Sequence, residues 1–194
     1  MATPESTAVD VALTRVIVTL QAKLTAALAA AEVAIAGLPL DAPAAAAYFM
    51  VGSADYIETV VPNHCVSCFV YQAGPSEIES HHSGNALTYS AYQTFEMDVV
   101  IAYGVAPYTP FTHSGKTTTG ADIMALRGHR YNAGVINALR QYAADETSIE
   151  DIRKVSDFAG AVKFNEEGQA VRGYATSTWE VFQNATVFHQ TLST

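Results

Sequence analysis

The sequence predicts an α+β fold in which an antiparallel sheet packs against two main helices. Two segments carry apolar residues at every third or fourth position, which is the spacing of a helix face, and several other segments alternate apolar and polar residues as strands do. Their order is helix, strands, helix, hairpin. The chain of 194 residues is 49% hydrophobic, so we expect one domain spanning residues 1–194 with a substantial core.

The first helix is predicted from about residue 6 to residue 36. Ser6 lies in a plausible start signal, and Gly37 with Pro39 should end the helix. Its most apolar part, Leu24–Ala36, is too short and too weakly hydrophobic to span a bilayer, so we expect no membrane partner. The apolar stripe consists of Val9, Leu13, Val16, Ile17, Leu20, Leu24, Leu28 and Ala31.

The middle of the chain should hold strands joined by loops. Tyr48–Val61 fits a short helix or a strand, Cys65–Tyr71 reads as a buried strand, and Ser76–Asn85 is polar enough for a loop. Thr88–Tyr103 is predicted as a long strand. Gly104–Thr119 is predicted as an extended loop, longer than most loops in compact domains, and such loops tend to be functional. One face of the long strand should carry Tyr89, Ala91, Gln93, Phe95, Met97, Val99 and Ile101, and the other Ser90, Tyr92, Thr94, Glu96, Asp98, Val100 and Ala102.

The second half should contain a helix and a hairpin. The helix is predicted over Gly120–Ala144, followed by a strand at Ile152–Phe164 and a β-rich run at Gln169–Phe188. Residues 165–168 have the composition of a tight turn. The predicted helix stripe is Ile123, Leu126 or Arg127, Tyr131, Val135, Ile136, Leu139 and Tyr142.

Charge is low and unevenly distributed. The net charge is −9, and charged residues make up 15% of the chain, which indicates that partner chains cover some of its surface. Arg15 and Lys23 are the only basic residues before Lys116, and the same stretch holds ten Asp and Glu. Sequence-specific DNA binding needs clustered basic residues, so we do not expect it. An acidic wall would instead let DNA pass without adhering to it.

The segment His64-Cys65-Val66-Ser67-Cys68 resembles half of a zinc site, and His81 or His82 could complete the ligand set. Residues three apart in a strand point to opposite faces, however, so the two sulfurs would not reach one ion. We therefore expect two small buried side chains and no metal, with a metal-binding module as an alternative.

Other candidate chemistry is weaker. Lys116 and Thr117 follow Gly115 as in a phosphate-binding loop, but Pro110 stands where that loop needs its first glycine. No Gly-x-Ser-x-Gly elbow is present. Glu96 and Asp98 share a strand face and could form an acid–base pair, although an exposed face or a subunit contact is the simpler interpretation. Trp179 is predicted to be core or interface. The sequence thus predicts no catalytic residue, no cofactor and no enzyme.

The order of elements, with Tyr92–Gly104 (YQTFEMDVVIAYG), Arg130–Leu139 (RYNAGVINAL) and the closing strand Gly173–Phe188, resembles tail-terminator and neck proteins of tailed bacteriophages. The resemblance implies a virion subunit, made in the host cytoplasm, that forms a homo-oligomeric ring, usually a hexamer. Such a ring caps the tail tube, joins it to the head-side connector and lets DNA through. The loop at 104–119 is then a candidate docking arm. A head-completion protein, a tail-tube protein and a binding module of unknown ligand remain alternatives.

Overall fold

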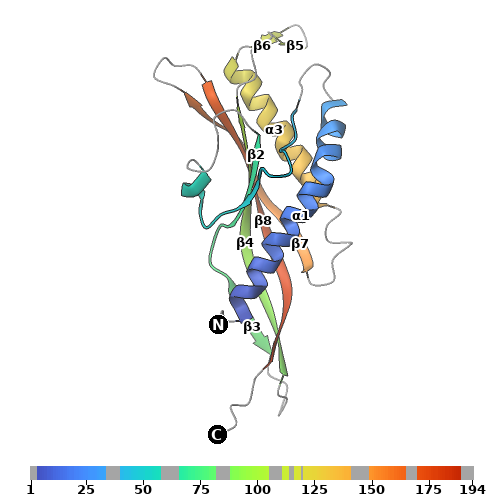
Figure 1. Cartoon of the computed structure of the whole chain (residues 1–194), viewed down its shortest axis with the longest axis vertical. Helices are drawn as coiled ribbons and strands as arrows, with labels where there is room; N and C mark the ends of the chain where they lie inside the picture. Colours follow the sequence, from blue (N-terminus) through green and yellow to red (C-terminus); the bar gives the residue numbers. More distant parts are fainter. Residues whose placement is uncertain are drawn as a thin grey trace.

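The structure, a computed structural model, describes residues 4–33, 40–57, 66–81, 88–104, 111–113, 116–118, 120–140, 149–164 and 170–188. It confirms the α+β class: helices α1 (Pro4–Val33) and α3 (Gly120–Leu139) cover one face of a mostly antiparallel sheet (Figure 1). The remaining elements are β1 (Tyr48–Met50), the 3-10 helix η1 (Ala54–Tyr56), β2 (Ser67–Gln72), β3 (Glu77–His81), β4 (Thr88–Gly104), β5 (Phe111–His113), β6 (Lys116–Thr118), β7 (Ile149–Phe164) and β8 (Ala170–Phe188).

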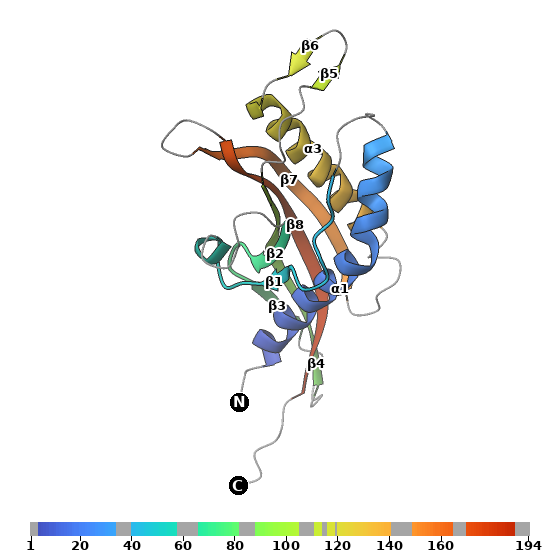
Figure 2. The ribbon, with the colours of Figure 1, turned by 45° about the horizontal axis from the view of Figure 1, so that its top comes forward.

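The main sheet has the strand order β1-β2-β4-β8-β7, and β3 also pairs with β4. Neighbouring strands in this sheet run antiparallel, except for β1 and β2, which run parallel to each other. β4 and β8 pair along their length, from Thr88 opposite Phe188 to Gly104 opposite Arg172. Figures 1 and 2 show one end of this pair extending beyond the helices.

The prediction of a loop over Ser76–Asn85 was wrong for residues 77–81, which form β3. β2 and β3 lie one after the other along the same edge of β4: Gln72 is opposite Met97 and Glu77 is opposite Thr94. A free strand edge can accept a polar partner strand, because pairing with a neighbour outweighs the weak local preference of the sequence. Residues 82–85 lie outside the described part of the chain.

The prediction of one extended loop over Gly104–Thr119 was also wrong in part, because β4 includes Gly104 and β5 and β6 form a hairpin within the range. This hairpin lies beyond the start of α3 and away from the main sheet (Figure 2). Its strands are short and rich in Thr, which favours extended backbone once two segments can pair. It is therefore a separate small feature attached to the domain.

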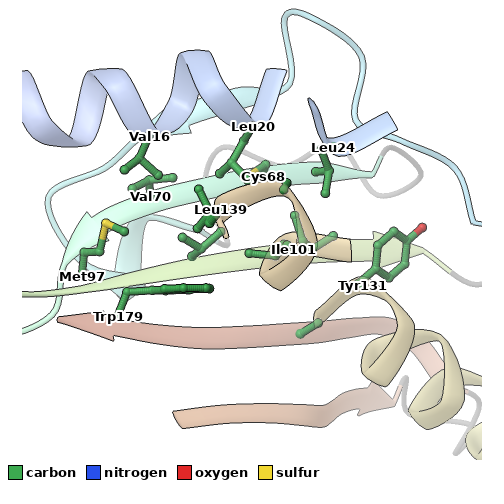
Figure 3. Packing of buried hydrophobic residues seen from close by; sticks show 14 of the residues in the cluster. Val16, Leu20, Leu24, Cys68, Val70, Met97, Ile101, Tyr131, Leu139 and Trp179 are labelled. Atoms are coloured by element: carbon green, nitrogen blue, oxygen red, sulfur yellow. The ribbon is translucent and has the colours of Figure 1, made fainter. Parts of the chain in front are cut away.

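The predicted alternation in the long strand is confirmed where side chains are described. Phe95, Met97, Val99 and Ile101 are buried under the helices, whereas Glu96 is exposed on the other face. Figure 3 shows Val16, Leu20 and Leu24 of α1 pointing at the sheet, where Cys68 and Val70 lie beneath them. The described members of the predicted α1 stripe are all buried or partly buried in this main core.

α1 begins at Pro4 and ends at Val33, so it starts two residues before the predicted position, and residues 34–36 are not described. Its Val9–Ala31 segment is long and apolar enough to cross a membrane by length and composition, and it is longer than the Leu24–Ala36 stretch. One face of this segment packs in the main core, however, as in core helices of globular domains.

α3 packs beside α1 and on β7 and β8. Its buried stripe passes through Arg127 and not Leu126, and it includes Met124, which the periodicity did not single out. The two helices approach closely at Gly134, where an added Cβ would lie 2.5 Å from Cδ2 of Leu28. Arg130 donates a hydrogen bond to the carbonyl of Ala31 near the end of α1 (3.0 Å), where a cation is favoured.

The opposite face of the sheet, here called the open face, is covered by neither of the two described α-helices. A small second core of Ile57, Phe69, Tyr71, Val100 and Ala102 lies on it beside η1. Elsewhere polar residues such as Thr176, Thr178 and Glu180 alternate with the buried residues of β8. This face is therefore partly available for contacts outside the chain.

Candidate self-association surface

β7 is an edge strand with unusual apolar exposure. It ends the strand order of the main sheet, and its outer edge has no strand partner among the described residues. Val155 is 49% exposed and Phe158 is 63% exposed. An edge strand offers unpaired backbone donors and acceptors to another chain, and soluble proteins usually protect such edges. β7 is therefore the main candidate for a contact with another subunit.

The pairing register shows where these two side chains lie. Phe158 is opposite Thr176, and Lys154 and Ser156 are opposite Trp179 and Thr178, which leaves Val155 in a bulge. Residues directly opposite each other share a sheet face. Phe158 therefore lies on the open face, like Thr176, whereas Lys154 lies on the helix face, like the buried Trp179.

A hollow of about 360 Å³ lies between the end of α3 and β7 on the helix face. Ile136 and Leu139 come from α3, Ile152 comes from β7, and Trp179 contributes from β8. Arg140, Arg153 and Lys154 complete its lining. The hollow thus has an apolar floor and lies next to the exposed edge of β7.

Arg140, Arg153 and Lys154 are the only exposed Lys and Arg among the side chains that the structure describes, and Arg153 lies on the open face because it is opposite Glu180. Arg153 pairs with Glu180 and lies over the ring of Phe182, 5.8 Å from its centroid. Lys154 pairs with Asp157 on the same strand. Exposed pairs of this kind contribute little to stability, about 0–1 kcal/mol each. With Glu150, Asp151 and Lys163 of β7 included, four cations and four carboxylates lie along this edge, which therefore has no net charge.

The other end of the sheet has the opposite character. β1 is the edge strand there; Phe49 stacks on Phe69 with ring centroids 5.3 Å apart, and Met50 is 48% exposed. Asp55 of η1 and Glu77 of β3 are exposed. Residues 24–115, which include β1 to β4, contain no Lys or Arg. This edge is therefore acidic.

Glu96 and Asp98 do not form an isolated pair of carboxylates. Asp98 accepts hydrogen bonds on both oxygens, from the hydroxyl of Tyr71 (2.9 Å) and from that of Thr178 (2.7 Å), whereas Glu96 is exposed. Burial and then the neighbouring Asp98 raise the pKa of Tyr71 well above its usual value. Asp98 thus holds β2 and β8 against β4, and we assign it a structural role.

Cys68 lies in β2 with its side chain in the main core, and burial raises the pKa of its thiol far above the usual range. A metal ligand must be a thiolate, which these surroundings disfavour. His64, Cys65 and His82 lie outside the described residues, and His81 is in β3. Among the described residues, no group of three His, Cys, Asp or Glu side chains is placed to hold a metal ion.

Two other sequence features are accounted for by the fold. Lys116 and Thr117 lie in β6, a hairpin strand, and not in the first turn of a helix as in a phosphate-binding loop. Gly115 and Pro110 lie outside the described residues. Trp179 is in the main core, where its indole N–H donates to the hydroxyl of Ser177 (2.9 Å).

The sequence analysis missed the edge position of β7 and the hollow beside it. The available signal was the run Arg153–Phe158, in which two apolar residues stand among charged and polar ones. Such a run also fits a half-buried strand, because alternation does not say whether a strand has one neighbour or two. Neither a scan of the sequence against protein-family models nor a search of curated proteins finds a match.

Proposed function

We propose that this chain is a virion structural subunit of the tail-terminator or neck type, which forms a closed ring at the end of the tail tube. The observation that carries the proposal is the exposed edge of β7 with Val155 and Phe158. The next copy in a ring would cover these two exposed apolar side chains and pair the unpaired edge of β7. The partners are further copies, the tail tube protein and the head-side connector.

Charge supports the conduit part of the proposal. The chain carries −9 overall, and its only exposed Lys and Arg among the described side chains lie at the β7 edge. A ring that covers this edge leaves mainly acidic surface uncovered, and such a surface repels the phosphate backbone. DNA then passes without sequence-specific binding. The proposal assigns no catalytic residue and no cofactor.

The test is the native mass of the purified protein by light scattering after gel filtration, with negative-stain imaging of the same peak. Six copies of the 20.6 kDa chain give about 124 kDa, and the images should show single rings with a central channel. Long filaments would replace the proposal with a tail-tube protein. A strict monomer would contradict self-association, and stoichiometric zinc that is lost on Cys65→Ser would favour the metal-binding alternative.

A further inference from the structure

The edge strand β7 is interrupted at regular intervals. Between Ile149 and Ala161 its register against β8 shifts at three places, which leave Glu150, Val155 and Gly160 as extra residues. Each extra residue shifts the alternation of side chains between the two sheet faces by one position. The extra residues are five positions apart, so the outer two lie at equal distances from the central one. The pattern of faces along β7 is therefore nearly the same when the strand is followed in either direction.

This symmetry allows two β7 strands to pair as antiparallel neighbours about a two-fold axis that passes between Val155 and Ser156. Residues opposite each other in such a pair must lie on the same sheet face. In this register Lys154 of each copy is opposite Asp157 of the other. Both residues lie on the helix face, because the β8 residues opposite them are buried beneath the helices. The faces therefore match across the axis.

The exposed apolar side chains of β7 lie close to this axis. Phe158 of each copy would be opposite Arg153 of the other on the open face, where a guanidinium next to an aromatic ring is favourable. Val155 would lie beside the axis, opposite Ser156 of the other copy. Pairing would thus cover Phe158 and Val155, which are 63% and 49% exposed in the single chain. It would also give the free backbone edge of β7 hydrogen-bond partners.

The charges of β7 suit pairing with a second β7. Lys154 pairs with Asp157 of its own strand and would also meet Asp157 of the other copy, so cations and carboxylates alternate around the axis. Glu150 and Asp151 would lie opposite the uncharged residues 160–161, so no carboxylate directly opposes another. Unlike charges directly opposite each other stabilise a strand pair, and like charges destabilise it. An edge with no net charge can therefore accept a copy of itself.

We propose that two copies of this chain pair through their β7 strands in this register. The pairing joins the two main sheets into one and keeps α1 and α3 of both copies on the same face. The inference goes beyond the proposed function, because the pair forms whether or not a ring closes. A ring of six can contain three such pairs, joined by a second contact elsewhere on the subunit.

The test reverses one charge of each cross-strand pair. Lys154→Asp and Asp157→Lys each bring only like charges together beside the axis, and both positions are exposed, so the fold should persist, which circular dichroism checks. Each variant alone should have a lower native mass than the wild type by light scattering. An equal mixture of the two should regain the wild-type mass, because each acidic side chain of one variant then faces a lysine of the other. The double variant Lys154→Asp/Asp157→Lys should regain it as well. Asp10→Lys is the matched control, because it makes the same charge change at an exposed position on α1, and it should keep the wild-type mass.

An unchanged mass of either single variant would overturn the β7 pairing while leaving the ring proposal standing. A mixture that does not regain the wild-type mass, or a loss of mass in the control, would do the same. Two copies of the 20.6 kDa chain give about 41 kDa. A wild type that stays at this mass at every concentration, with variants that behave as expected, would support the pairing and overturn the ring. A wild type that is monomeric at every concentration would overturn both.

Discussion

Gly173 on β8 is the position where a single methyl group should disturb the core most clearly. Gly173 is opposite Tyr103 on β4, and a Cβ at this site would lie 2.4 Å from both Cε2 and Cζ of the tyrosine ring. The ring is fully buried and cannot swing away freely. Its hydroxyl donates to the carbonyl of Met124 (2.7 Å), and its centroid lies 4.9 Å from that of Tyr131.

The expected cost of Gly173→Ala follows from these distances. Moving the ring from 2.4 Å to an ordinary contact of at least 3.4 Å needs a shift of about 1 Å. Overpacking of this kind costs about 1–3 kcal/mol, and weakening the hydroxyl hydrogen bond adds about 0.5–1.5 kcal/mol. Replacing a strand glycine returns about 0.5–1 kcal/mol. We expect a net loss of about 1–3 kcal/mol, with a fall in Tm of about 2–4 °C for each kcal/mol.

Urea denaturation of the wild type and the variants measures this loss. Gly74→Ala is the matched control, since its Cβ would meet only Oε2 of Glu96, at an ordinary 3.9 Å. Tyr103→Leu removes the clashing ring atoms, so in that background Gly173→Ala should cost much less. The steric account fails if Gly173→Ala is as stable as the wild type, or if its cost is unchanged in the Tyr103→Leu background.

Four further predictions concern helix α1, the buried tyrosines Tyr103 and Tyr71, and the β5–β6 hairpin. Leu24→Ala, at a fully buried site on α1, should lower the unfolding free energy by about 2–5 kcal/mol in urea denaturation, and an unchanged value would mean that α1 is not a core helix. Burial raises the pKa of Tyr103 to about 12, so the hydroxyl proton of Tyr103 is lost at lower pH in the unfolded chain than in the folded one. The neutral tyrosine therefore stabilises the folded state below pH 10, and this stabilisation is lost between about pH 10 and 12. Urea denaturation at several pH values across that range measures the loss. Asp98→Asn should lower the pKa of Tyr71, which ultraviolet titration against Tyr71→Phe measures, and an unmoved pKa would show that the carboxylate does not act on it. Deleting residues 111–118, which hold the β5–β6 hairpin, should leave the melting curve unchanged and weaken assembly, whereas an unfolded product would show that the hairpin belongs to the core.

The helices and long strands were predictable because their signals are local. The three-four spacing from Val9 to Ala31 and the alternation from Phe95 to Ile101 depend only on which residues must face a core, so they appear in the sequence whatever the neighbours are. Where the sequence is polar, it was harder to predict whether a segment forms a strand. β3 forms because β4 is long enough to pair first with β2 and then with β3 along the same edge. The length of β4 cannot be inferred from residues Glu77–His81 alone.

The sequence by itself determined the fold class and the uneven charge, with no Lys or Arg between residues 24 and 115. Only the tertiary structure decided that β1, β2 and β3 from this acidic part lie at one end of the sheet and that β7 lies at the other. It also decided that Phe158 is exposed and that a hollow lies beside β7. The physical reason is that strand order comes from pairing between segments far apart in the chain. The alternation of apolar and polar residues within one strand does not indicate which strand pairs with it, or whether any strand pairs with it.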